Sequence, residues 1–328
     1  MKKALEIFKK HTMLIVLVLV VLFFTITTGG SMVSSANFNS LITQNAYVYV
    51  LATGMMMCML TGGNIDLSVG SVVCFLGAIG GTLMVNKGWS TGSAMAIMLV
   101  VGLLSGCLQG FLIAYLNIPP WISTLAGYLA FRGWGTAILD GLTISPMPDD
   151  FVKIFSGNVP DIFGVPGFNL TCLIVGIICC VVFALLQLKA RATKESKGYE
   201  VEAKNSTLIR IILVCAVIMI FTIQFAVRNG IPYALIWIAV VVLIYEFITS
   251  KTTIGRYFYT IGGNVEATRL SGIDTKKIFF LAYLNMAFLT VIATWLTLAR
   301  LTAANPTAGT NYEMDAISAC VVGGVSAY

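Results

Sequence analysis

Charged residues are scarce in this sequence. Only 10% of the 328 residues are Asp, Glu, Lys or Arg, whereas about a quarter of a soluble domain is charged. Hydrophobic residues make up 58% of the chain, and the mean hydropathy is +0.92. A water-soluble surface needs more charge than this, so the composition indicates a protein of the lipid bilayer. The net charge of +6 then reflects orientation in the membrane and does not indicate a nucleic-acid partner.

Sequence motifs that bind nucleotides or metals are also missing. His11 is the only histidine and no Gly-Lys dipeptide occurs, so the chain carries no Walker A loop of its own. The eight cysteines lie in apolar stretches without a Cys-x-x-Cys pair, which argues against a disulfide framework or a zinc site. We therefore expect no catalytic residue, no metal and no cofactor here, and an intramembrane enzyme is the least supported class.

Ten apolar segments follow one another along the chain and predict an all-α polytopic membrane protein with about ten transmembrane helices, some of them broken. The segments are 13–28, 41–60, 65–85, 94–116, 121–139, 170–188, 209–227, 233–249, 278–300 and one that begins near 313. The first segment also resembles a signal peptide. Its length and the many spans that follow favour a retained helix.

Basic residues are distributed unevenly between the loops. Cytoplasmic loops collect Lys and Arg, and a cytoplasmic N-terminus places most of them inside. The basic residues of the expected external loops are Lys87, Lys153 and Arg228. This topology makes 189–207 a charged cytoplasmic insert and 251–277 a cytoplasmic loop. The proline-rich segment 140–169 is predicted to be an irregular external loop.

The stretch from Thr61 to Ser71 interrupts the apolar sequence with glycines and short polar residues. Glycine frees the backbone, and Asn64, Asp66 or Ser68 is suited to cap a helix that begins inside the membrane. Broken helices at membrane depth are tolerated where they are buried or line a cavity. Two interpretations fit equally well, a translocation pathway with Asp66 near its centre and an ordinary tight turn.

Two further features lie inside predicted spans. Arg132 is in the middle of the segment 121–139, and charged residues in spans usually face the interior of a helix bundle. It is suited either to line a pathway or to form a structural ion pair. Gly102, Gly106 and Gly110 form two overlapping Gly-x-x-x-Gly steps, which predict close helix packing and no binding site.

The loop 251–277 is patterned as well as polar. Asn264 followed by Glu266 is typical of a helix N-cap with an acidic first turn, and Gly272 is typical of a C-cap. These signals predict a short helix on the cytoplasmic face. It would serve either to dock a soluble partner or as a simple connector.

Four stretches together resemble one known family. They read TGGNIDLSVGS within 54–71, GLLSGCLQGFLIAYLNIPPWISTL at 102–125, IGGN with EA and RLSGI within 255–273, and ARLTAANPTAGTNYEMDAISACVVGG at 299–324. The sequence resembles the membrane permease subunit of bacterial ABC importers for monosaccharides. Within the ribose, xylose and galactose group it looks closest to the xylose or multiple-sugar branch.

The resemblance implies a multi-pass permease of the bacterial cytoplasmic membrane that moves a monosaccharide by alternating access. It implies four partners: a second permease copy, cytoplasmic ABC ATPase subunits, an extracytoplasmic sugar-binding protein and the sugar itself. The residues implied to meet the ATPase are Gly262, Gly263, Asn264, Glu266, Ala267, Arg269, Ser271 and Gly272. Those expected near the translocation pathway are Asn64, Asp66, Ser68 and, from its place in a span, Arg132.

The resemblance also implies further sequence after Gly324, because members of the family continue with more apolar sequence. We therefore expect 1–328 to be a single permease domain that is truncated at its C-terminus. The alternative function is a secondary sugar transporter driven by an ion gradient. Such a carrier would need an ion site in the membrane, for which only Asp66, Arg132 and Glu246 are available.

Overall fold

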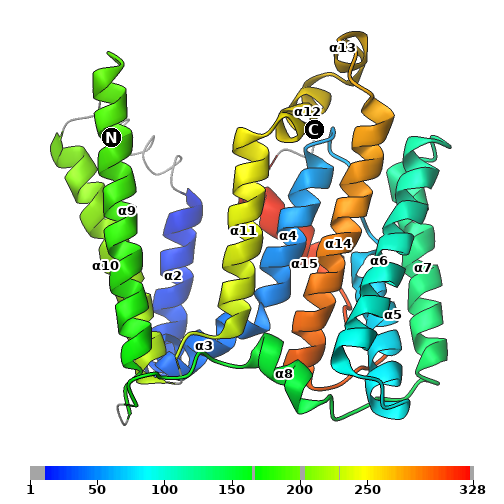
Figure 1. Cartoon of the computed structure of the whole chain (residues 1–328), viewed down its shortest axis with the longest axis horizontal. Coiled ribbons are helices and arrows are strands. Elements are labelled where there is room, and N and C mark those ends of the chain that lie inside the picture. Colours follow the sequence, from blue (N-terminus) through cyan, green and yellow to red (C-terminus); the bar gives the residue numbers. More distant parts are fainter. Residues whose placement is uncertain (1–11, 165–166, 200–203, 229, 326–328) are drawn as a thin grey trace. The chain divides into compact units, whose positions relative to one another are not determined.

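The computed structural model describes residues 12–164, 167–199, 204–228 and 230–325. All regular elements in these ranges are helices, as predicted, and they comprise fourteen α-helices and two short helical segments (Figure 1). Their bounds are α2 Thr12–Thr27, η1 Ser31–Val33, α3 Ser35–Gln44, α4 Ala46–Met59, α5 Val69–Gly81, η2 Thr82–Asn86, α6 Thr91–Ala114, α7 Pro120–Ile138, α8 Asp149–Ser156, α9 Leu170–Ser196, α10 Lys204–Val227, α11 Tyr233–Lys251, α12 Thr253–Gly263, α13 Val265–Leu270, α14 Thr275–Leu301 and α15 Tyr312–Val322.

Six helical stretches of the described chain are long and apolar enough to cross a membrane. They are Val69–Asn86, Thr91–Ala114, Leu170–Ser196, Lys204–Val227, Tyr233–Lys251 and Thr275–Leu301. Two shorter apolar helices are Ile15–Thr27 and Ala46–Met59. A helix lies in each of the ten segments that the sequence predicted, so the polytopic helical class is confirmed. The predicted segment 41–60 is interrupted, because α3 ends at Gln44 and α4 begins at Ala46.

The chain forms two compact units. The first contains residues 1–42 and 158–233, with α9 and α10 packed side by side (Figure 1). Helix α3 contacts α10 through Phe38, whose ring packs edge-on against Phe221 at a centroid distance of 4.5 Å. The predicted charged insert 189–207 is partly helical, because α9 continues to Ser196.

The second unit contains residues 43–157 and 234–328, and α14 lies at its centre. This helix packs against α4, α5 and α6 and is buried over most of its length. A Cβ atom on Gly102 would overlap with Val291 of α14, and one on Gly106 would overlap with Ala287. The Gly-x-x-x-Gly prediction of close helix packing is therefore confirmed.

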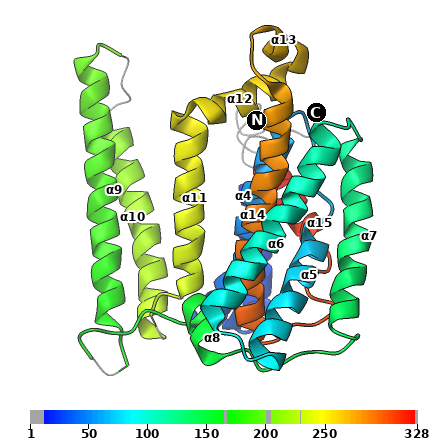
Figure 2. The ribbon, with the colours of Figure 1, turned by 45° about the vertical axis from the view of Figure 1, so that its right-hand side comes forward.

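Different elements lie at the two ends of α14. Helices α12 and α13 precede its N-terminus, whereas α8 lies at the opposite end of the unit (Figure 2). The sequence predicted only an irregular loop where α8 forms. That helix has acidic residues in its first turn and buries Phe151 and Phe155 on one face, so tertiary packing stabilises a helix between the prolines.

Candidate functional site

The break between α4 and α5 is built from glycine and from local side-chain hydrogen bonds. Gly62 and Gly63 have φ angles of 93° and 79°, a region of backbone conformation that side chains disfavour. The Asn64 amide donates to the carbonyl oxygen of Thr61 at 3.0 Å and to its hydroxyl at 3.1 Å. These contacts fix the turn that leads from α4 into the interior of the unit.

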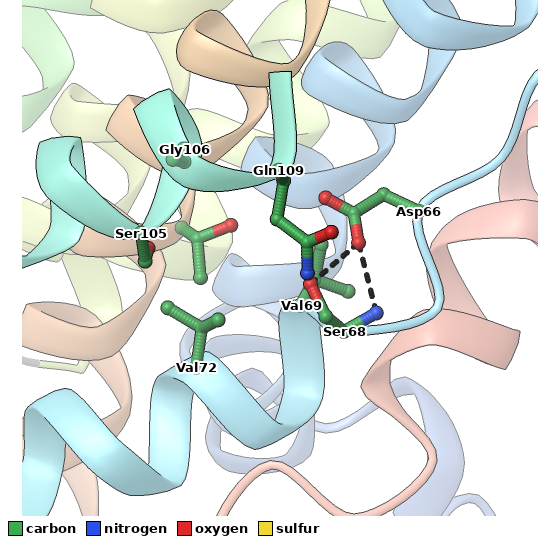
Figure 3. Close-up of a pocket in the computed structure, with 9 residues that line it drawn as sticks. Asp66, Ser68, Val69, Val72, Ser105, Gly106 and Gln109 are labelled. Carbon is green, nitrogen blue, oxygen red and sulfur yellow. Dashed lines mark hydrogen bonds between the residues drawn. The ribbon is translucent and has the colours of Figure 1, made fainter. Parts of the chain in front are cut away.

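Asp66 closes the other side of this break (Figure 3). Its Oδ1 atom accepts hydrogen bonds from the Ser68 backbone N–H at 2.8 Å and from the Ser68 hydroxyl at 2.6 Å. Only 5% of Asp66 is exposed. A carboxylate that accepts backbone N–H groups organises the start of a helix, and α5 begins at Val69. Two of the predicted pathway residues, Asp66 and Ser68, thus come together in a buried turn before α5, and the Ser68 side chain at the N-cap position makes no capping hydrogen bond.

A small cavity lies beside this turn. Residues of the Asp66 turn, α5, α6 and α14 surround it: Asp66, Ser68, Val69, Val72, Ser105, Gly106, Gln109, Ala287 and Thr290 (Figure 3). Its volume is about 10 Å³, roughly the space that one water molecule needs. Gln109 of α6, one of the lining residues, accepts a hydrogen bond from Ser123 of α7 at 2.8 Å. The cavity is therefore closed to a sugar in this conformation.

Arg132 does not join Asp66 in this cavity. Its Nη1 atom donates to the carbonyl oxygens of Pro306 at 2.9 Å and Ala308 at 2.7 Å, while its buried Nη2 atom has no hydrogen-bond partner in the described chain. The side chain thus anchors a second break, the segment 302–311 between α14 and α15. Among the described residues Arg132 forms no ion pair, and its role in lining a pathway stays a prediction.

The two breaks meet inside the unit. A Cβ atom on Gly70 at the start of α5 would overlap with the carbonyl oxygen of Gly309 and lie 2.5 Å from Oε2 of Glu313. Glu313 is 5% exposed, and its Oε2 atom has no hydrogen-bond partner in the described ranges. Sequence reasoning missed Glu313, although an acidic residue in the last apolar segment was the available signal.

The predicted cytoplasmic helix is present as α13. The Asn264 side chain accepts a hydrogen bond from the Ala267 N–H at 2.9 Å, and Gly272 ends the helix with a φ of 85°, so the two predicted caps are confirmed. Arg269 donates to Glu266 at 3.0 Å, and this hydrogen bond lowers the pKa of the exposed Glu266 carboxyl below its ordinary value. The exposed residues of this region are Gly262, Gly263, Asn264, Val265, Glu266, Ala267, Arg269, Leu270, Ser271 and Gly272.

Gly262 and Gly263 have different surroundings, although the family resemblance implies that both meet the ATPase. A Cβ atom on Gly262 would overlap with the carbonyl oxygen of Leu60, whereas one on Gly263 would meet nothing within 4 Å. Helix α12 therefore rests backbone to backbone on the α4–α5 turn at Gly262. The next residue faces open space.

These features define a multi-pass membrane protein in which two broken helices meet in the interior and a short capped helix projects at one end. The family described as branched-chain amino acid transport system / permease component matches residues 37–328. The chain belongs to this family and is a permease component of the cytoplasmic membrane. No solved structure matches it.

Relatives with similar sequences are sugar permeases by name. The xylose transport system permease protein XylH of Haemophilus influenzae is 34% identical over 316 residues, which cover 96% of this chain and 82% of the relative. XylH of Escherichia coli (strain K12) is 33% identical over 314 residues, with 96% and 78% covered. The ribose import permease protein RbsC of Haemophilus influenzae is 29% identical over 290 residues, with 88% and 69% covered.

Proposed function

We propose that this chain is the membrane-spanning permease of an ATP-driven ABC importer and that it carries a monosaccharide into the cytoplasm by alternating access. The similarity to xylose and ribose permeases over most of the chain supports a sugar as the solute. About ten helices cross the membrane in this proposal, with the N-terminus and the insert 189–207 in the cytoplasm. Residues 1–328 act as one permease domain.

The proposal includes the partners of such an importer. Two copies of the permease enclose the path, and ABC ATPase subunits bind the cytoplasmic segment 251–277. An extracytoplasmic sugar-binding protein delivers the solute at the other face. ATP hydrolysis takes place on the ATPase subunits, and the free energy biases the permease between its two states.

The contact of Gly262 with Leu60 is the observation that carries the proposal. A partner that moves α12 also moves the turn at Gly62, because two backbones in contact have no flexible side chain between them. The turn leads directly to Asp66 and the cavity beside it. Gly262 therefore transmits the movement inward, while the exposed residues from Gly263 to Gly272 bind the ATPase. Asn64, Asp66 and Ser68 shape the path, and Arg132 holds the segment that crosses it.

Two neighbouring glycine variants test this division of roles. Gly262→Ala introduces a methyl group against the Leu60 carbonyl, whereas Gly263→Ala points its methyl group into open space. We expect Gly262→Ala to leave the complex assembled and its basal ATPase activity intact. Sugar moved per ATP hydrolysed should fall by about tenfold, since overpacking of this kind costs about 1–3 kcal/mol.

Gly263→Ala is a closely matched control, because Gly262 and Gly263 are adjacent in the same helix. Gly263→Ala should keep the ratio of transport to hydrolysis within about twofold of the original protein, since it creates no overlap. Equal ratios in both variants would contradict the transmission role of Gly262. A second measurement serves if Gly262→Ala displaces α12. Met56 of α4 and Tyr259 of α12 line one pocket together with Leu60 and Gly262, and spin labels at these two positions in a chain that keeps Gly262 should stay at a constant distance through the ATPase cycle.

A further inference from the structure

A cluster of polar and aromatic side chains lies at the other end of α14. We call it the tyrosine cluster, and its members are Gln44, Tyr47, Thr297, Arg300, Tyr312 and Asp315. Arg300 is in the last turn of α14, whereas α13 precedes the first turn. The 27 residues of this helix separate the two sites by about 40 Å at 1.5 Å per residue. In the proposed topology the tyrosine cluster faces the side from which the solute arrives.

Two tyrosine rings join α4 to α15 in this cluster. The rings of Tyr47 and Tyr312 stack with their centroids 3.5 Å apart and their planes inclined by 10°. The Tyr47 hydroxyl donates a hydrogen bond to Oδ2 of Asp315 at 2.7 Å. Separation of α4 and α15 at this end would expose both ring faces and the carboxylate, while the Cys320 thiol of α15 contacts the Ala52 carbonyl oxygen of α4 at 3.2 Å further along the two helices.

A pocket adjoins the stacked rings. Its lining residues are Thr43, Gln44, Tyr47, Leu296, Thr297, Arg300 and Tyr312, and its volume is about 10 Å³. The side chains of Gln44 and Arg300 are exposed and have no hydrogen bond to another described residue. The pocket therefore brings the Gln44 amide and the Arg300 guanidinium next to the aromatic surface of Tyr47 and Tyr312. The Asp315 carboxylate lies outside the lining and contacts the Tyr47 hydroxyl.

We propose that the tyrosine cluster is a contact site for a monosaccharide on its way into the permease; this inference rests on the proposed function. The stacked rings are its closed form. When α4 and α15 separate, the C–H face of a sugar ring takes the place of one tyrosine against the other. Asp315 accepts hydrogen bonds from sugar hydroxyls, Arg300 donates to them, and Gln44 does both.

The composition of the cluster favours a neutral polyhydroxylated ligand over an ion. One carboxylate and one guanidinium balance each other, so the site has no net charge to attract an anion or a cation. The tyrosine faces offer an apolar surface, and the polar groups around them fix orientation, which is the usual division of roles in small-molecule sites. A clamp that only held two helices together would not need free hydrogen-bonding groups at its edge.

Saturation-transfer NMR with D-xylose tests the site directly. The purified permease–ATPase complex is used without the binding protein, so that any transfer to xylose protons comes from the complex itself. We expect transfer with the original chain and a signal about tenfold weaker in Asp315→Ala and Tyr312→Ala, because each removes a hydrogen-bonding or stacking partner. The control Tyr49→Phe changes an exposed tyrosine of α4 outside the pocket and should keep the signal.

Absence of transfer in the original complex, or equal transfer in all variants, overturns the inference. Should Tyr312→Ala fail to fold, Asp315→Ala decides alone, because it preserves the stacked rings. ATP-driven xylose uptake by the original complex with its binding protein separates the two proposals. Uptake without variant-sensitive transfer contradicts the tyrosine cluster only, whereas no uptake contradicts the proposed function.

Discussion

Gly70 of α5 and Gly309 of the segment 302–311 meet backbone to backbone where the two broken helices cross. A side chain at Gly70 has no room there, because its Cβ atom would overlap with the Gly309 carbonyl oxygen and press on Glu313. Gly309 itself has a φ of 73°, which any residue with a Cβ atom disfavours. The interior of the second unit therefore depends on two glycines that are far apart in the sequence.

We expect Gly70→Ala to destabilise the protein by about 1–3 kcal/mol, because the methyl group forces two packed backbones apart. Thermal unfolding in detergent measures this effect. Gly92→Ala is the matched control, since Gly92 lies in the first turn of α6 with nothing within 4 Å of an added Cβ atom. It should be neutral or stabilising by up to about 1 kcal/mol through helix propensity. Equal effects would contradict the crossing.

Arg132→Lys should release the segment 302–311. A lysine ammonium lacks the planar fork with which Arg132 contacts the carbonyl oxygens of Pro306 and Ala308. Cys74 reports the change, because its thiol contacts the Pro306 carbonyl oxygen at 3.4 Å. We expect maleimide labelling of Cys74 to become faster in this variant, as measured by site-resolved mass spectrometry.

Cys172 in the first unit is the internal control for this experiment, since its thiol contacts Thr222 and should label at an unchanged rate. An Arg228→Lys variant provides the same substitution in a loop. If Cys74 reacts equally fast in the original chain and in Arg132→Lys, Arg132 does not hold the segment.

Asp66→Asn and Asp66→Ala should differ. The amide oxygen of asparagine still accepts hydrogen bonds from the Ser68 N–H and hydroxyl, which Asp66 binds at 2.8 and 2.6 Å, whereas alanine leaves both donors without a partner. Leaving a buried donor without a partner costs about 1–3 kcal/mol. We therefore expect a lower unfolding temperature for Asp66→Ala than for Asp66→Asn. Equal unfolding temperatures for the two variants, both below that of the original chain, would show that the charge, and not these hydrogen bonds, is the important feature.

Charge reversal at α13 should separate docking from folding. Glu266→Lys or Arg269→Glu places like charges on an exposed helix that projects from the unit, so expression should persist while uptake and stimulated ATPase activity fall together. The double swap restores the pair within the helix but not its match to a partner. Recovery of coupling by the swap would assign the pair a role inside α13 only.

The pH dependence of that docking follows from the lowered pKa of Glu266. When the pKa of a carboxyl is lower in the folded protein than in the unfolded chain, the folded carboxyl is still charged at the pH where the unfolded one takes up a proton. It loses its charge only as the pH falls through the lower, folded value. Activity that depends on Glu266 should therefore be unchanged from neutral pH down past the ordinary range of a glutamate. Stimulated ATPase activity, measured against a Glu266→Gln variant, checks this.

The features that the sequence predicted well are those with local causes. The caps of α13 follow from Asn264 and Gly272, because each acts on a backbone within a few residues. The Gly-x-x-x-Gly face was equally clear, since the spacing alone places Gly102 and Gly106 on one side of α6.

Other features depend on residues distant in sequence and were therefore missed. Nothing near Arg132 indicates that its partners are carbonyl groups more than 170 positions away. The difference between Gly262 and Gly263 arises only when α12 lies on Leu60. Helix α8 forms between prolines because Phe151 and Phe155 find buried positions, and eight residues of helical spacing were too short a signal to outweigh the prolines around them.

Uptake in reconstituted vesicles tests the central claim most directly. Vesicles contain the permease and its ATPase subunits, with ATP on the ATPase side and D-xylose with its binding protein on the other. The account predicts accumulation of xylose that requires ATP and persists when ionophores collapse the proton and sodium gradients. Accumulation that follows an imposed ion gradient and is indifferent to ATP would contradict it and establish a secondary carrier.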